Sequence, residues 1–228
     1  MEKRDFKDRL YGQFARLGRA LASPHRLELI DLLAQGERSV EELATEASLS
    51  IANASQHLRA LRQAELVANR REGTRVLYRL AGPRVWELWH ALRTAAETQL
   101  AEIDRVTAAF LTRRDEMEAI GADELLRRLA EDDVILLDVR PALEFRQGHI
   151  AGARSMPVAE IAQRISELPE GRSIVAYCRG PYCVYADEAV EMLSAHGRRA
   201  QRLTGGYPEW AAAGLPVETG AYGSRGSS

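Results

Sequence analysis

The pattern of apolar residues changes near residues 112–121, and this change constrains the fold more than any other feature. Before it, apolar residues recur every three or four positions, which is typical of helices, and one stretch predicts a hairpin. After it, short apolar runs alternate with helical segments, which is typical of a parallel α/β sheet. A chain of 228 residues is long enough for two small domains. We therefore predict a first domain over residues 1–111, a linker over 112–121, a second domain over 122–217 and a flexible tail over 218–228.

Two short helices and a hairpin are predicted in the first domain. Ser39 and Glu42 have the spacing of a capping box at the start of one helix, and Ser50 can cap the next, over residues 51–64. Residues 66–71 and 75–80 have the character of paired strands, with Gly73 between them able to adopt a positive φ. Helix, turn, helix and hairpin in this order describe a winged helix-turn-helix, mainly α with a β-hairpin wing.

The second helix of such a motif lies in the major groove of DNA. Its early residues carry amide and hydroxyl side chains that bond base edges, and its arginines lie nearer the phosphates. The hairpin carries four arginines against one acid, so it can bind the backbone or a minor groove although the whole chain has a net charge of -2. The predicted DNA-binding residues are Asn53, Ser55, Gln56, Arg59, Arg71 and Arg75.

One long amphipathic helix is predicted over residues 85–111, because apolar residues recur there in steps of three and four. This stripe is too long and apolar to face water alone. Together with the predicted helix over residues 6–21, it would form the surface of a homodimer.

The first domain resembles the ArsR family of small bacterial repressors, through the stretches ALASPHRLELIDLL, SVEELATEASLSIANASQHLRALRQAELV and NRREGTRVLYRL. The resemblance implies a symmetric dimer on a palindromic double-stranded operator. Many members sense metals through a cysteine pair that is absent here, and His90 has no partner histidine at ligand spacing. We therefore predict neither a metal site nor a cofactor.

The two cysteines, Cys178 and Cys183, lie close together in a chain without a targeting signal or a membrane-spanning apolar run. We therefore expect a cytoplasmic protein in which a structural disulfide is unlikely to form. Cys178 follows a predicted buried strand and precedes a helix, a turn that aims backbone N–H groups at one point. Such a turn lowers the pKa of a thiol, so we predict that the Cys178 thiolate persists near neutral pH, with Arg179 adding positive charge near the mouth.

Residues 120–217 resemble a rhodanese domain, through the stretches LLDVRPALEFRQGHIAGARSMP, IVAYCRGPYC and LTGGYPEWAAAGLPV. The resemblance implies an α/β parallel-sheet domain with sulfurtransferase activity. Cys178 would accept sulfane sulfur from thiosulfate, polysulfide or a persulfide, and Asp138 and Arg140 would support its loop by hydrogen bonds. Glu144 would be structural. A related fold makes phosphatases that need an arginine where this chain has Val184, which argues against that activity.

Two interpretations of Cys183 stay open. It is either a small buried residue at the start of a helix or a resolving thiol that closes a disulfide or polysulfide bridge with Cys178. Three functions follow: a repressor that responds to reactive sulfur, a sulfurtransferase whose DNA-binding domain serves localisation or autoregulation, and a DNA-binding protein with an inert second domain. The presence of Cys178 weighs against the third, and Cys183 favours the first over the second, because a plain transferase needs one thiol.

Overall fold

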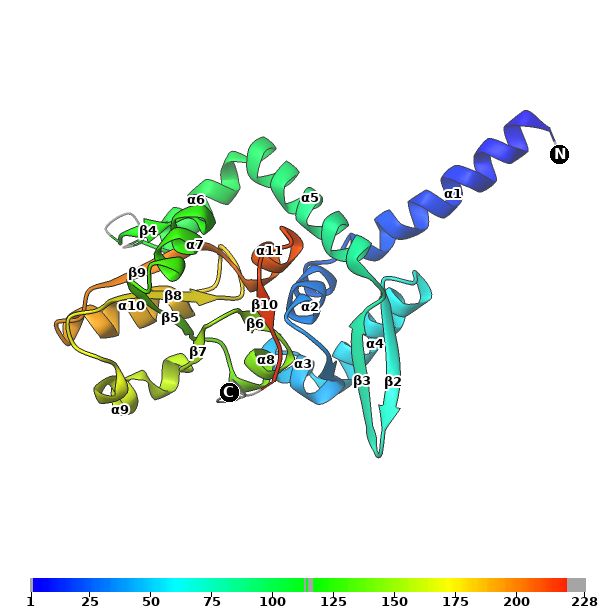
Figure 1. Ribbon diagram of the computed structural model, residues 1–228. Coiled ribbons are helices and arrows are strands. Elements are labelled where there is room, and N and C mark those ends of the chain that lie inside the picture. The colour runs from blue at the N-terminus through cyan, green and yellow to red at the C-terminus, as the bar shows by residue number, and fades with distance from the viewer. Residues whose placement is uncertain (1, 113, 115–116, 221–228) are drawn as a thin grey trace. The chain divides into compact units, whose positions relative to one another are not determined.

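The computed structural model describes residues 2–112, 114 and 117–220. The chain divides between Ala96 and Glu97 into two compact parts, called unit 1 and unit 2 below and described separately (Figure 1). Within the described residues, no helix has the length and apolar character needed to cross a membrane.

Unit 1 is built from helices around one apolar core. Its core includes fully buried leucines and an isoleucine from α2, α3 and α4. Both predicted helix caps are confirmed: the Ser39 hydroxyl accepts from the Glu42 amide at 3.2 Å, and the Ser50 hydroxyl accepts from the Asn53 amide at 3.2 Å. The helices are α1 (Lys3–Leu21), α2 (Pro24–Ala34), α3 (Val40–Glu46), α4 (Ile51–Gln63) and α5 (Pro83–Gln99), the last of which runs three residues into unit 2.

A three-stranded antiparallel sheet completes unit 1, in the order β1-β3-β2. The strands are β1 (Arg38–Ser39), β2 (Val67–Glu72) and β3 (Arg75–Leu80). Gly73 lies in the turn between β2 and β3 with a φ of 59°, as the sequence predicted. The base of the hairpin is buried at Val67 and its tip is exposed, so the hairpin projects from the helices as a wing (Figure 1).

The prediction of one long helix over residues 85–111 is wrong. The helix is interrupted at Leu100, whose backbone is extended (φ −115°, ψ 92°), and α6 (Ala101–Phe110) begins after it. The apolar spacing continues across the interruption, so periodicity alone could not detect it.

Unit 2 contains a five-stranded sheet in the order β4-β9-β8-β5-β7, and all its pairings are parallel. The strands are β4 (Ala119–Ile120), β5 (Val134–Asp138), β7 (Arg154–Ser155), β8 (Ser173–Cys178) and β9 (Ala200–Gly206). A separate antiparallel pair joins β6 (His149–Ile150) to β10 (Val217–Glu218). The predicted α/β fold with a parallel sheet is confirmed.

Helices cover both faces of this sheet, as parallel sheets require. Helices α9 (Ile161–Arg164) and α10 (Tyr185–Ala195) pack on the face that includes Ala176 and Cys178. Helices α7 (Ala122–Ala130), α8 (Ala142–Gln147) and α11 (Tyr207–Ala212) pack on the face that includes Val175 and Tyr177. Because successive side chains on a strand point to opposite faces, neighbouring residues of β8 enter different cores.

Two structural details differ from the sequence expectations. Strand β4 lies within the segment predicted to be a linker, because a two-residue strand is too short to leave a readable pattern. Glu218, assigned to the flexible tail, pairs with His149 in the β10–β6 ladder. The rest of that tail from residue 221 onward lies outside the described residues.

Candidate functional site

The cysteine loop, defined here as residues 178–184, begins where the central strand of the unit 2 sheet ends. All six residues of β8 are buried, and α10 starts at Tyr185 directly after the loop. The β8–β9 pairing shifts register between Ala176 and Cys178, a local irregularity of the kind often found beside active sites. The carboxyl end of a central parallel strand is where α/β sheets commonly place their reactive groups.

Strand β9 approaches the cysteine loop so closely that only glycine fits at its end. A Cβ atom built on Gly206 would lie 2.4 Å from the Gly180 nitrogen and 2.6 Å from the Cys178 carbonyl oxygen. Both distances are too short for any side chain, so Gly206 fixes how the loop lies on the sheet. The sequence shows this glycine in the LTGGY stretch without showing what it contacts.

Asp138 and Arg140 form a buried ion pair at the end of β5, and both side chains are fully buried. The Arg140 backbone amide and its Nε donate to Asp138 Oδ1 at 3.0 and 2.9 Å. The Tyr177 hydroxyl donates to Asp138 Oδ2 at 2.6 Å. The Arg140 guanidinium also donates to the Gly148 carbonyl at 2.7 Å and lies 4.4 Å from the centre of the Tyr207 ring. These hydrogen bonds therefore link the ion pair to Tyr177, the neighbour of Cys178, and support the loop through β8.

Arg179 was predicted to add positive charge near the mouth of the loop, but the structure pairs it with a buried carboxylate. Its side chain is 12% exposed and its guanidinium donates to Glu144 Oε1 at 3.0 and 2.6 Å, while Glu144 itself is buried. The guanidinium also lies 5.4 Å from the centre of the Tyr185 ring. Glu144 balances the Arg179 charge and ties the cysteine loop to α8.

The thiols of Cys178 and Cys183 lie close enough for each to shift the pKa of the other. Cys178 is buried at 2% exposure and Cys183 is half-buried. Backbone amides favour the thiolate form of both residues: those of Gly180 and Ala186 act to lower the pKa of Cys178, and those of Arg179 and Tyr185 act to lower the pKa of Cys183. The Cys178 sulfur also lies 3.6 Å from the Cys183 carbonyl oxygen. The loop therefore holds two thiols in one ring of amides.

Ionisation of this pair differs from the sequence prediction. Burial raises the pKa of the Cys178 thiol well above its usual range, and the neighbouring Cys183 adds to the rise. The hydrogen bond from Cys178, together with the two amides, lowers the pKa of Cys183. The prediction of a low pKa for Cys178 is therefore wrong for the reduced pair, in which burial favours the protonated Cys178 thiol.

Arg114 contacts the cysteine loop from the segment that follows α6. Its guanidinium donates to the carbonyl oxygens of Pro181 and Cys183, the latter at 3.2 Å. It also donates to Asp187 in the first turn of α10, with Nε at 3.0 Å from Oδ2. Sequence reasoning missed Arg114, because it lies in a charged stretch without periodicity and its partners are more than 65 positions away.

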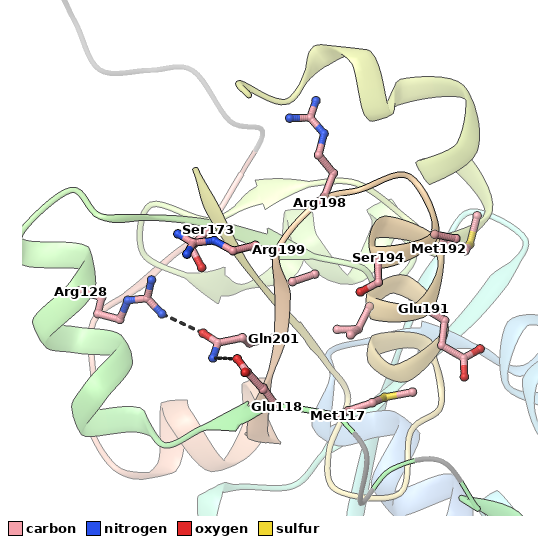
Figure 2. Close-up of a pocket in the computed structure, with 13 residues that line it drawn as sticks. Met117, Glu118, Arg128, Ser173, Glu191, Met192, Ser194, Arg198, Arg199 and Gln201 are labelled. Carbon is pink, nitrogen blue, oxygen red and sulfur yellow. Dashed lines mark hydrogen bonds between the residues drawn. The ribbon is translucent and has the colours of Figure 1, made fainter. Parts of the chain in front are cut away.

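A large open cavity of about 980 Å³ lies at the opposite end of β8 from the thiols. Ser173 and Ala200, at the starts of β8 and β9, belong to its lining. Figure 2 shows Gln201 between Arg128 and Glu118, to which it is bonded at 2.8 and 2.7 Å. Neither cysteine lines this cavity, so it is separate from the reactive pair.

The predicted DNA-binding residues lie on α4 and the wing of unit 1. Helix α4 buries Ala54, Leu58 and Leu61, so Gln56 and Arg59 are exposed on its outer side, while Asn53 and Ser55 are half-buried beside them.

On the wing, Arg71 and Arg75 are exposed. Arg70 is also exposed but forms ion pairs with Glu37 at 2.6 Å and Glu72 at 2.8 Å. The positive charge of the wing is therefore smaller than its arginine count suggests.

Among the residues that the structure describes, no three histidine, cysteine, aspartate or glutamate side chains gather as a possible metal site.

Comparisons with known proteins match both units. Residues 23–69 match the arsR family of bacterial regulatory proteins, and residues 121–213 match the rhodanese-like domain. The HTH-type transcriptional regulator Rv0324 of Mycobacterium tuberculosis is 48% identical over 217 residues, which are 95% of this chain and 95% of that protein. A sulfurtransferase of Allochromatium vinosum is 39% identical over 99 residues, which are 43% of this chain and 92% of that protein. A solved homodimeric winged helix-turn-helix DNA-binding domain from Mycobacterium bovis is 45% identical and covers 44% of this chain and 91% of that fragment, with a TM-score of 0.41.

The similarity to the Mycobacterium tuberculosis regulator spans both units, so it identifies the whole chain and not one domain. The sulfurtransferase similarity is confined to less than half of the chain. The resemblances stated from the sequence, to an ArsR-type regulator and to a rhodanese domain, are confirmed. The chain belongs to the arsR family of bacterial regulatory proteins, as a DNA-binding transcriptional regulator in which a rhodanese-like domain follows the winged helix-turn-helix.

Proposed function

We propose that unit 2 accepts sulfane sulfur on its cysteine pair and that this reaction changes the affinity of unit 1 for its operator. The observation that carries the proposal is the close pairing of Cys178 and Cys183 in one loop, where the Cys178 sulfur lies 3.6 Å from the Cys183 carbonyl oxygen. Amides stabilise the negative charge of a thiolate or a persulfide. A second thiol close to the first can convert the persulfide into a bridge between the two cysteines, and this bridge would keep the protein in its sulfur-treated state.

Sulfur acceptance starts with a proton transfer within the pair. The Cys183 thiolate takes the proton of Cys178 through their shared hydrogen bond. The Cys178 thiolate then attacks the outer sulfur of thiosulfate, forms a Cys178 persulfide anion and releases sulfite. With a polysulfide or a low-molecular-weight persulfide as donor, the leaving group is the shortened polysulfide or the thiolate. Cys178 is thus the proposed acceptor and Cys183 its base.

Bridge closure follows without an external oxidant, because the bound sulfane sulfur is the electron acceptor. Cys183 attacks the Sγ atom of the Cys178 persulfide, forms a disulfide and expels the outer sulfur as hydrosulfide, which carries away the Cys183 proton. If Cys178 carries two added sulfur atoms, attack on the first of them gives a trisulfide and again releases hydrosulfide. Both products consume both thiols within one chain.

Catalytic sulfur transfer is the second candidate function, and the similarity of unit 2 to a sulfurtransferase favours it. In this reaction an external thiol or cyanide takes the outer sulfur of the Cys178 persulfide and restores the thiolate. Operator affinity would then be independent of sulfur loading, and Cys183 would be dispensable for turnover.

Operator binding by the full chain, before and after polysulfide treatment, tests the first candidate against the second. We expect the reduced and loaded proteins to differ in operator Kd, and we expect intact mass to show added sulfur or loss of two thiols in the loaded protein. Cys178→Ser, which removes the acceptor, should show the reduced-state Kd under both conditions. Unchanged Kd in wild-type protein that has taken up sulfur would favour the transferase.

We also propose that unit 1 forms a homodimer on a palindromic duplex. Several large apolar side chains of α1 and α5 are exposed within unit 1, whereas Val85 is buried in its core and the Trp89 indole donates to Asp31. The dimer surface therefore differs from the stripe predicted from periodicity: it comprises Phe6, Leu10, Tyr11, Phe14, Leu88 and Leu92. Sedimentation should show a dimer at micromolar concentration, and Phe14→Glu should shift it to a monomer. A wild-type monomer would refute this proposal.

A further inference from the structure

All three nitrogen atoms of the Arg114 guanidinium group form hydrogen bonds within unit 2. Its side chain is 14% exposed, and its three nitrogen atoms bond the carbonyl oxygens of Pro181 and Cys183 and the carboxylate of Asp187. Asp187 is also largely buried, at 11% side-chain exposure. A guanidinium presents its donors in a rigid planar fork, so these three acceptors must keep their relative positions for all the bonds to persist.

Two of these acceptors belong to the cysteine loop. The Cys183 carbonyl oxygen that Arg114 binds also lies 3.6 Å from the Cys178 sulfur. The backbone held by Arg114 is therefore the same backbone that positions one thiol against the other. The third acceptor, Asp187, belongs to α10, so Arg114 fastens the loop to the helix that follows it.

Bridge formation is incompatible with an unchanged loop. A disulfide bond is about 2.0 Å long, which is much shorter than the contact between two hydrogen-bonded thiols. Inserted sulfur atoms lengthen the bridge instead. We expect either product to displace the Cys183 backbone, and with it the carbonyl oxygen that Arg114 binds. A simple persulfide on Cys178 does not impose this displacement.

A cavity next to Arg114 provides room for such a change. It has a volume of about 240 Å³ and is lined by the end of α6 and the start of α10, including Phe110, Leu111, Val184 and Asp187. All of these residues belong to unit 2. A shift of the Arg114 segment into this space would displace no packed side chain of the sheet.

We propose that Arg114 acts as a latch, whose bonds to the cysteine loop depend on whether Cys178 and Cys183 are bridged. In the reduced protein it binds the loop; closure of the Cys178–Cys183 bridge moves the two carbonyl oxygens and releases Arg114 from them. Because the chain leaves unit 1 through α5 and continues into α6, Arg114 lies on the covalent path between the thiols and the DNA-binding unit. The inference rests on the proposed function, and it makes Arg114 a positioning residue, not a catalytic one.

The test uses the full-length Arg114→Gln protein, with Arg105→Gln as the matched control. Arg105 lies on α6, is 77% exposed and pairs with Glu102 one turn away. Each variant is treated with polysulfide, and sulfur uptake by intact mass and operator Kd are measured on the same samples. We expect Arg114→Gln to take up sulfur and lose free thiols like wild type, while its Kd changes by less than about twofold. Coupling between sites is commonly about 5- to 150-fold, so this loss is measurable. Arg105→Gln should respond like wild type.

Asp187→Asn provides a second variant should Arg114→Gln fold poorly, because it keeps the side-chain volume and removes the charge that anchors the guanidinium. Amide hydrogen exchange in wild type gives an independent readout: polysulfide should accelerate exchange in the first turn of α10 and in β4. A wild-type protein without sulfur uptake or without a change in Kd would overturn the proposed function itself. A wild type that responds, together with variants that respond equally, would overturn the latch and leave the proposed function standing.

Discussion

Replacement of Asp138 by asparagine tests whether the buried ion pair at the end of β5 holds the cysteine loop in place. Asparagine has nearly the same volume, so the change removes charge without creating a cavity. Arg140 is fully buried and would keep its charge after losing the carboxylate that binds its guanidinium. Breaking a buried pair in this way costs about 3–5 kcal/mol. The asparagine amide would also face either the Arg140 donors or the Tyr177 hydroxyl, which are all donors to Asp138 in the native protein.

This loss is a large fraction of the free energy of unfolding of a typical domain, which is about 5–15 kcal/mol. Since unit 1 does not contain the substitution, the assay has to report on unit 2 alone. We would follow amide hydrogen exchange of β5 and β8 against urea concentration, and we expect these strands to open at much lower denaturant in Asp138→Asn. Exchange in α2 and α4 should be unchanged.

Glu124→Gln is the matched control, because Glu124 pairs with Arg127 on the exposed side of α7, where both side chains are about half exposed. Exposed pairs contribute little to stability, so this variant should behave like wild type. Asp138→Leu combined with Arg140→Met should regain part of the lost stability, since the double change removes both charges of the pair. Equal stability of Asp138→Asn and Glu124→Gln would refute the reasoning.

Three further predictions concern the thiols and the wing. In wild type the first thiolate should form below the usual cysteine pKa, because Cys178 donates to the Cys183 thiolate. In Cys183→Ser the first thiolate should form at higher pH, because only the buried Cys178 then remains. Ultraviolet absorbance against pH measures both midpoints, and a midpoint displaced by one pH unit changes the thiolate fraction about tenfold. Thiosulfate or polysulfide should add mass in steps of about 32 Da to Cys183→Ser but little to Cys178→Ser, and loading on Cys183 with Cys178 inert would reverse the proposed roles. Arg71→Ala with Arg75→Ala should weaken binding to all duplexes alike and flatten its salt dependence, whereas Arg70→Ala should have a smaller effect because Arg70 is already paired within unit 1; equal effects would contradict the charge assignment.

Much of the candidate site could be read from local sequence. Cys178 at the end of a buried strand, and Asp138 and Arg140 at the end of its neighbour, follow from apolar runs that stop at polar residues. The role of Arg179 could not be read this way: its partner Glu144 is 35 positions away, so sequence alone suggested an open positive charge where the structure has a closed ion pair. Arg70 was misjudged for the same reason, because Glu37 is 33 positions away.

By itself, the sequence predicted the winged helix-turn-helix and the parallel α/β sheet. These depend on periodicity, capping residues and turn glycines, which act between residues a few positions apart. The tertiary structure alone decided three features: that Arg70 and Arg179 are ion-paired, that burial raises the pKa of Cys178, and that Arg114 binds the cysteine loop. Desolvation and long-range hydrogen bonds set these features, and both arise only when distant segments of the chain are brought together.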